Sequence, residues 1–375
     1  MVEVREVNDA KELRAFIRLP WKIYKNDPNW VPPLISDVKR TLDRKKSPFF
    51  EFGEAIYYIA YKEGAPAGRI SAHINNRHNT YQKATDGFFG FYECIDDPEV
   101  SDSLLKAACD WVKSKGMTRI LGPASFTIYD EPCFMIDGWD ADPPTPIIMQ
   151  NYNPRYYLDQ MAKSGFGKEI DWYAYRVDEG RSLSKAMLGA KERLIKSKGF
   201  VFRNVDLKHI DDEVVKIKEI FNDAWSENWG HHPYTERQVD RIKEALVAIV
   251  DPRLCYMVET SDGQPVACAV ILPDINPAVR KMNGRILPIG WIYLLRARRR
   301  TPGTRAFMMG VLKPYRHTGV DVAMVVEAMV VGPPLGYKWA DCSLIVETNE
   351  PMIRLVEKWG GARYKSYRIF SRRLS

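Results

Sequence analysis

Residues 310–321, GVLKPYRHTGVD, combine the residue types that can hold a phosphate group. An apolar, strand-like run leads into Arg316, and an apolar pattern typical of a helix resumes just after Gly319. A strand that delivers Arg-x-x-Gly into a helix N-terminus exposes successive backbone N–H groups, which bind an anion together with the helix dipole. A guanidinium suits phosphate, and glycine lets the backbone approach it closely. The candidate phosphate-binding residues are Val311, Leu312, Arg316, His317, Thr318, Gly319, Val320 and Asp321.

Three further stretches carry side chains suited to acid–base chemistry. Glu347 lies mid-strand in SLIVETN, shortly before Asn349, and an acid in a buried strand needs a partner. RISAHINNRHN places His73 near the end of one predicted strand, and SFTIYDEPC places Glu131 after another. A histidine near a carboxylate can act as a general base. Polar surface loops and structural ion pairs use the same residue types, so both interpretations stay open.

The loop AWSENWGHHPYT gathers aromatic and imidazole side chains between two predicted helices. Such a loop either anchors its tryptophans in the core or shapes a pocket for a substrate. The candidate substrate-binding residues are Trp225, Trp229, His231 and Tyr234.

Length and composition restrict the class of protein. A chain of 375 residues suits two domains, and 45% hydrophobic with 27% charged residues is typical of a soluble globular protein. The charged N-terminus predicts no secretory signal, and six scattered cysteines without a CxxC pair predict reduced thiols in the cytoplasm and no metal site. The net charge of +7 suits acidic partners. Nucleic acid is not expected, because no zinc finger or RNP-type strand occurs.

Residues 287–300, LPIGWIYLLRARRR, read as a short apolar helix with a cationic end. The helix is too short to span a membrane. It fits either a core helix with a solvated tail or an interfacial element that meets anionic lipid. The second interpretation places this cytoplasmic protein peripherally at the inner face of the membrane.

Two matched elements recur in order about half a chain apart. YIAYKEGAPAGRISA from Tyr58 and YMVETSDGQPVACAV from Tyr256 both predict hairpins, and NPRYYLDQMAKSGF parallels NEPMIRLVEKWGG. We therefore predict a tandem duplication, divided into residues 1–178 and 179–375. Alternating strands and helices in each half predict an α/β fold, a mixed sheet covered by helices.

At KPYRHTGVD and SLIVETNEPMIRLVEKWGG the chain resembles the GNAT superfamily, the Gcn5-related N-acetyltransferases. Its members carry Arg/Gln-x-x-Gly-x-Gly/Ala after the fourth strand. Two elements later they carry a strand, an Asn, a helix and a Gly-aromatic. In stretches such as SPFFEFGEA and GFFGFYECIDDPEV, over nearly its full length, the chain is similar to bacterial tandem-GNAT proteins, the group that includes bacterial ceramide synthases. The resemblance implies two tandem GNAT-like (acyl-CoA N-acyltransferase) domains.

The implied reaction moves an acyl group, long-chain in the preferred version, from acyl-CoA or acyl carrier protein to a small-molecule or lipid-like amine, without a metal. The resemblance assigns catalysis to Glu347 and Asn349, and His73 and Glu131 are the candidates in the first half. That half lacks the Arg-x-x-Gly motif after its fourth strand, so we expect the donor in the second half.

Two positions depart from the family pattern. Asp321 replaces the last Gly/Ala of the phosphate motif, and a carboxylate repels a pyrophosphate. Either Asp321 points outward as a helix first-turn acid, or the donor is a carrier protein with a single phosphodiester. Val356 stands where many members place a tyrosine acid. These departures leave two alternatives open, a catalytically silent acyl-CoA sensor and an aminoacyl or peptidoglycan-precursor transferase.

Overall fold

The computed structural model describes the chain except residues 131, 181–182 and 375, and the side chains of residues 298–300. The chain folds into two compact units. Unit 1 contains residues 1–173, 279–290 and 364–375, and unit 2 contains residues 174–278 and 291–363. Each unit is described by itself.

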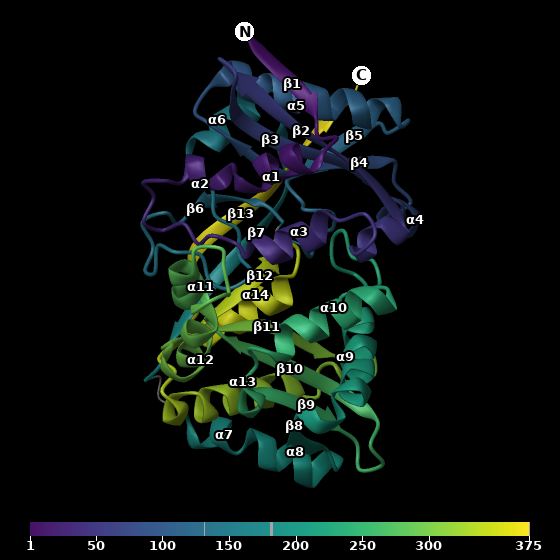
Figure 1. Ribbon diagram of the computed structural model, residues 1–375. Coiled ribbons are helices and arrows are strands. Elements are labelled where there is room, and N and C mark those ends of the chain that lie inside the picture. The colour runs from purple at the N-terminus through teal and green to yellow at the C-terminus, as the bar shows by residue number, and fades with distance from the viewer. Residues whose placement is uncertain (131, 181–182, 375) are drawn as a thin grey trace. The chain divides into compact units, whose positions relative to one another are not determined.

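Unit 1 is built on a mixed sheet with the strand order β1-β2-β3-β4-β5-β13, and β6 pairs with β13 (Figure 1). The first four strands pair antiparallel, β4 and β5 pair parallel, and β13 pairs antiparallel with β5. The strands are β1 (Val2–Glu6), β2 (Gly53–Lys62), β3 (Ala65–Asn75), β4 (Asp86–Cys94), β5 (Arg119–Gly122), β6 (Phe134–Asp137) and β13 (Ala362–Arg373).

Helices cover both faces of this sheet, because successive side chains of each strand point to opposite faces and both faces carry apolar residues. Ile70, Ala72 and Ile74 of β3 share one hydrophobic cluster with Leu104 and Val112. Leu104 and Val112 belong to α5 (Pro98–Ser114). The other helices of unit 1 are α1 (Ala10–Arg18), α2 (Pro20–Ile23), α3 (Ile35–Leu42), α4 (Asn76–Gln82) and α6 (Tyr156–Lys163). The opposite face holds a second cluster, with residues of α1 and α3 among its members.

Unit 2 repeats the same plan. Its strands follow the order β7-β12-β11-β10-β9-β8, in which β8, β9, β10 and β11 pair antiparallel and β11 pairs parallel with β12. The strands are β7 (Gly167–Asp178), β8 (Val201–Asn204), β9 (Cys255–Glu259), β10 (Pro265–Pro273), β11 (Gly303–Val311) and β12 (Trp339–Val346). Unit 2 contains β7 only from residue 174 onward.

The helices of unit 2 again lie on two faces. Residues of α8 and α13 belong to one hydrophobic cluster with β9 and β10, and Ile220 of α9 belongs to another with Met257 and Cys268. The helices are α7 (Lys185–Leu188), α8 (Ala190–Lys198), α9 (Ile210–Ala224), α10 (Glu236–Val247), α12 (Gly290–Arg300), α13 (Val320–Val331) and α14 (Glu350–Lys358), while α11 (Asn276–Met282) crosses the boundary between the units.

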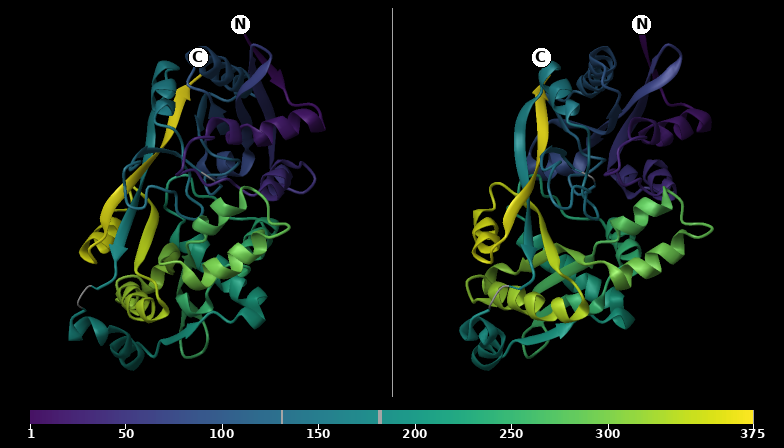
Figure 2. Two further views of the ribbon diagram at one scale, coloured as in Figure 1. Left: turned by 60° about the vertical axis from the view of Figure 1, so that its left-hand side comes forward. Right: turned by 90° about the vertical axis from the view of Figure 1, so that its left-hand side faces the viewer.

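The last strand of each half of the sequence crosses the boundary between the units. In unit 1, β13 pairs with β5 from Phe370↔Gly122 to Arg373↔Arg119, and Figure 2 shows β13 in yellow beside the teal β7. The later residues of β7 belong to unit 2. The two predicted hairpins, β2–β3 and β9–β10, are confirmed. The division at residue 178 concerns the halves of the duplication and stays a prediction.

Candidate functional site

In unit 2, β11 and β12 separate partway along their length. The two strands pair from Gly303↔Trp339 to Ala306↔Cys342, although β11 continues to Val311 and β12 to Val346. On its other edge β11 stays paired with β10, but the register skips Phe307. Such an extra residue bends a strand and strengthens its twist. Beyond Ala306, therefore, β11 keeps its β10 partner, and no strand among the described residues pairs with its other edge.

A buried ion pair lies at the point where the strands separate. Arg305 and Asp341 are register partners, and their side chains approach to 4.0 Å between Nε and Oδ1. Both residues are buried. Arg305 Nε also donates to the carbonyl oxygen of Ser343 over 3.4 Å, and the Ser343 hydroxyl donates to Asp341. Buried charges are stable only when paired, so this group fixes the two strands to each other just before they diverge.

The predicted phosphate turn follows directly from β11. After a short 3-10 turn, Lys313–Tyr315, the chain reaches Gly319 with φ 89° and enters α13. The first backbone hydrogen bond of the helix runs from Ala323 N to Gly319 O over 3.0 Å. Within the described chain, no group accepts from the N–H groups of residues 320–322. The turn thus presents three free donors at the positive end of the helix dipole.

Basic side chains surround this turn. Arg316 Nη2 donates to the carbonyl oxygen of Ala224 over 3.3 Å, and its Nη1 lies 3.5 Å from Glu227 Oε2. Lys313 Nζ lies 3.3 Å from Glu227 Oε1, and the Lys313 N–H donates to Asp223 Oδ2 over 2.7 Å. Lys313 was missed by the sequence analysis, although it belongs to the same basic run. The C-terminal end of α9 and the residue Glu227 that follows it therefore hold the turn, through the Lys313 backbone and both cations.

The remaining residues of the turn have more local roles. Thr318 donates from its hydroxyl to the carbonyl oxygen of Tyr315 over 2.7 Å, which closes the turn on itself. His317 is exposed and has φ 64°. Asp321 is half-buried in the first turn of α13, and Leu312 packs beside Ile220. Whether any of these residues contacts a phosphate stays a prediction.

Three of the four predicted aromatic-loop residues gather around Phe221 of α9. Trp225 and Tyr234 stack on the Phe221 ring, each with a centroid distance of 5.0 Å, and His231 lies 5.4 Å away. Burial lowers the pKa of His231 to about 4, so its imidazole is neutral at pH 7. Trp229 is half-buried.

The cluster lies against β11. A Cβ atom on Gly310 would come within 2.7 Å of the Trp225 ring, so Gly310 lets this ring sit directly on the strand. Gly310 was not among the residues predicted from the sequence, where its only signal is a glycine inside a strand pattern. The aromatic cluster and the turn thus meet at the same end of β11.

Unit 1 has the same separation of strands, but its own residues occupy it. β4 and β5 pair only as far as Phe88↔Leu121, although β4 continues to Cys94. Beyond that point the N–H of Ala124 donates to the carbonyl oxygen of Phe89 over 2.9 Å. The Tyr157 hydroxyl accepts from Cys94 N over 2.9 Å, and the Tyr156 hydroxyl donates to Cys94 O over 2.8 Å.

The helix that follows β4 is capped as well. Asp97 Oδ1 accepts from Glu99 N over 3.0 Å and from Val100 N over 3.2 Å at the start of α5. Its counterpart α13 begins at Gly319, which has no side chain to offer. The two units therefore differ where a ligand phosphate would bind, and unit 2 has the open helix terminus.

Comparison with known proteins decides the family. No family model matches the sequence. A bacterial ceramide synthase from Caulobacter vibrioides is 32% identical over 381 residues, which cover 100% of this chain and 98% of that protein. The chain belongs to the family of this bacterial ceramide synthase. Protein YghO of Escherichia coli is 31% identical over 383 residues, 99% of this chain and 95% of that protein.

Solved structures bear out the predicted fold. A tandem GNAT protein from the clavulanic acid biosynthesis pathway superposes with a TM-score of 0.57 at 11% identity, covering 100% of this chain and 99% of that one. A GCN5-related N-acetyltransferase from Sphaerobacter thermophilus gives 0.52 at 13% identity, with 100% and 96% covered. The predicted α/β mixed-sheet fold with two tandem GNAT-like domains is confirmed.

Two catalytic candidates of this acyltransferase lie just beyond β12. The placement of Glu347 in mid-strand was wrong, because β12 ends at Val346 and Glu347 is half-buried in the turn that follows. Asn349 caps α14, and its Oδ1 accepts from Met352 N over 3.3 Å. Val356, at the position of the expected tyrosine acid, is buried. The catalytic roles of Glu347 and Asn349 stay predictions.

The candidates in unit 1 have other surroundings. His73 is fully buried, stacked on Phe88 at 5.6 Å and edge-on to Phe49 and Phe126. In the described residues neither of its ring nitrogens has a hydrogen-bond partner, and burial lowers its pKa to about 3. These contacts favour packing, and a catalytic role of His73 stays a prediction. Glu131 lies outside the described residues.

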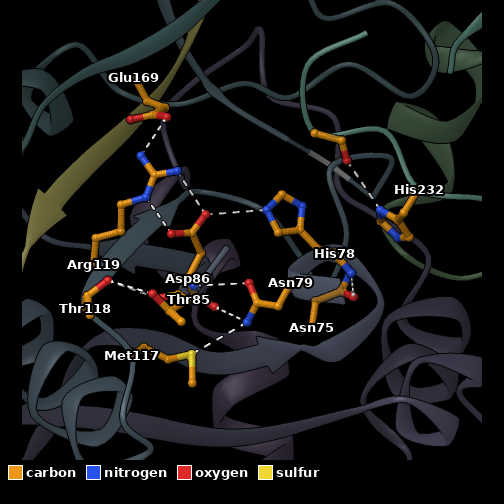
Figure 3. A network of polar contacts seen from close by, with 11 residues as sticks. Asn75, His78, Asn79, Thr85, Asp86, Met117, Thr118, Arg119, Glu169 and His232 are labelled. Carbon is orange, nitrogen blue, oxygen red and sulfur yellow. Dashed lines mark hydrogen bonds and ion pairs between the residues drawn. The ribbon is translucent and has the colours of Figure 1, made fainter. Parts of the chain in front are cut away.

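A histidine–carboxylate pair does form at this end of β3, with partners that the sequence did not indicate. His78 Nε2 lies 3.5 Å from Asp86 Oδ2, and Arg119 Nη2 donates to the same oxygen over 2.9 Å (Figure 3). Arg119 also donates to Glu169 over 3.0 Å. Burial alone would raise the pKa of Asp86, but the hydrogen bonds from His78 and Arg119 outweigh it and lower the pKa. The network joins β4, β5 and β7.

The described residues contain neither a cluster of metal ligands nor a membrane-spanning helix. No group of three or more His, Cys, Asp or Glu side chains is placed to hold a metal ion in this part of the chain. Among the helices described, none is both long and apolar enough to cross a bilayer.

Proposed function

We propose that this protein transfers an acyl group from acyl-CoA, or from the phosphopantetheine arm of acyl carrier protein, to the nitrogen of an amine. The donor would bind in unit 2, along the edge of β11 that has lost its β12 partner. One observation supports this most: the unpaired edge beyond Ala306 leads directly to a helix start with three free N–H groups. A donor carries the matching groups, an amide-bearing arm that ends in phosphate.

In this arrangement the phosphate accepts from the N–H groups of residues 320–322, with Arg316 and Lys313 near it. The amine nitrogen attacks the thioester carbon, the C–S bond breaks, and the thiolate leaves. Backbone N–H groups of the free β11 edge would stabilise the negative charge that develops on the carbonyl oxygen. An amine of pKa ~10 arrives as an ammonium ion, so one proton must be removed before attack.

We propose that the Glu347 carboxylate accepts this proton from the amine. A carboxylate is an anion at neutral pH and attracts the ammonium form, whereas His231 is buried and neutral with a pKa of about 4. Glu347 lies in the turn that directly follows β12, the strand from which β11 separates beyond Ala306.

For the acceptor we propose a long-chain amine. The name of the Caulobacter relative, a bacterial ceramide synthase, supports a lipid-like amine, because a ceramide is an amide of a long-chain base.

The test incubates the purified chain with long-chain acyl-CoA and a long-chain amino alcohol, and mass spectrometry measures the amide. We expect turnover, one donor bound per chain by calorimetry, and at least a hundredfold lower kcat in Glu347→Gln with nearly unchanged KM. Glu350→Gln, an exposed acid at the start of α14, is the matched control and should keep full activity. Two donors per chain would contradict the assignment to unit 2, and equal activity of both variants would remove Glu347 from the mechanism.

A further inference from the structure

Residues 285–296 expose apolar side chains at unusual density. Among the described residues fourteen large apolar side chains are exposed, and five of them fall within ten consecutive positions: Ile286, Leu287, Ile289, Trp291 and Leu295. Leu287 is 74% exposed and Leu295 is 58% exposed. The segment crosses the boundary between the units at residue 290, and its side chains are exposed on both sides of that boundary. Contiguous exposed apolar residues mark an interaction surface.

The chain just before this segment is firmly held within unit 1. Asn283 Oδ1 accepts from Trp21 Nε1 over 2.7 Å, and Arg280 Nη1 donates to the carbonyl oxygen of Pro28 over 2.8 Å. Gly284 has φ 80°, and a Cβ atom there would lie 2.5 Å from the Trp21 ring. This turn therefore needs glycine, and the exposed residues extend from a fixed base.

The sequence on both sides of the segment carries charges of a single sign. Residues 275–320 contain no Asp or Glu and ten Lys or Arg. Lys281, Arg285 and Arg296 are exposed beside the apolar side chains. The sequence continues with Arg298, Arg299 and Arg300, whose side chains lie outside the described residues. A partner for this surface must offer apolar depth and negative charge side by side.

We propose that residues 285–296 bind the surface of a lipid bilayer that contains anionic lipids. In this arrangement Leu287, Ile289 and Trp291 enter the boundary between headgroups and acyl chains, while Arg285 and Arg296 lie at the lipid phosphates. The 11 residues of α12 extend about 16 Å, too short to cross the hydrocarbon core. Binding to lipid is independent of the proposed acyl transfer, and its test measures no turnover.

The test is co-sedimentation of the full chain with vesicles of phosphatidylglycerol and phosphatidylcholine, at low salt and at 1 M salt. We expect binding that salt weakens, because the Debye length shortens to about 3 Å. Leu287→Ser with Leu295→Ser should bind at least tenfold more weakly at an unchanged melting temperature. The matched control replaces two exposed valines of α9 and α10, Val215→Ser with Val247→Ser, and should bind like the wild type.

Substitutions of single arginines test the cationic part of the proposed lipid-binding surface. Arg285→Gln and Arg296→Gln should each weaken binding to the anionic vesicles roughly fivefold. Lys106→Gln, an exposed cation on α5, should leave binding unchanged. The proposal is overturned if the wild type ignores anionic vesicles at low salt, or binds phosphatidylcholine alone equally well. It is also overturned if the leucine pair binds normally, or if that pair melts several degrees below the valine control, because the leucines would then be packed inside the protein.

Discussion

Replacing Gly319 by alanine separates the conformational role of this residue from its role in binding. Gly319 has φ 89°, and no atom lies within 4 Å of the position that a Cβ would take. The substitution therefore meets no steric obstacle, and its cost in stability is that of a left-handed alanine, ~1–2 kcal/mol. For a unit of this size that corresponds to a fall in melting temperature of roughly 2–4 °C per kcal/mol.

Gly336 provides the control for this experiment. It has φ 94° and open space around its Cβ position, and it lies in unit 2 beyond the end of α13. Gly336→Ala should therefore lower the melting temperature by a similar amount. For Gly319→Ala alone we expect CoA to bind at least tenfold more weakly, about 1.4 kcal/mol, because residue 319 directly adjoins the free N–H groups at the start of α13. Calorimetry with CoA checks the difference. Normal CoA binding by Gly319→Ala, or equal losses in both variants, would refute the assignment of the turn to phosphate.

Three other predictions concern charged groups. Arg316→Ala should weaken CoA binding at least tenfold in calorimetry, and Glu227→Ala should strengthen it modestly, because Glu227 lies 3.5 Å from the Arg316 guanidinium. Asp321→Ala should tighten CoA and leave a phosphopantetheinyl carrier protein almost unaffected; equal effects on both donors would make Asp321 a simple first-turn acid. Hydrogen bonding to Arg203 lowers the pKa of Glu259 from 4.5 to about 2. This carboxylate therefore stabilises the fold above pH 4.5, and its contribution is lost as the pH falls toward 2. Acid titration of unfolding should show a shallower slope for Glu259→Gln over that range, and an unchanged slope would contradict the assignment.

Local patterns in the sequence predicted the parts of the fold that depend on local chemistry. Gly64 and Gly263 marked two hairpin turns, and the Arg-x-x-Gly pattern marked a strand, a turn and a helix start, all of which the structure contains. The extent of pairing between two strands is set by tertiary packing, so the separation of β11 from β12 after Ala306 had no signal of its own. The end of β12 was misjudged by about one residue, which moved Glu347 from a strand into a turn.

The place in unit 1 where β4 separates from β5, which side chains of the same unit fill, shows a second limit of prediction from sequence. Tyr157 satisfies the Cys94 N–H from a different element, and nothing near Cys94 in the sequence identifies that partner. A pair of tyrosines at the start of α6, where the other half has Met352 and Ile353, was the available clue. The buried partner of His78 was missed for the same reason, since Asp86 becomes a neighbour only when α4 returns toward β4.

The place of β13 in unit 1 has a consequence for how the chain is made. β5 gains its second neighbour from residues that the ribosome adds only after all of unit 2. Until then β5 has an open edge, and an unpaired edge invites pairing with another chain. The first sheet thus waits for the second half of the chain, so the halves of this duplication cannot be separated by a cut between them without leaving the earlier sheet unfinished. In the predicted duplication, the last strand of the second half completes the sheet of the first.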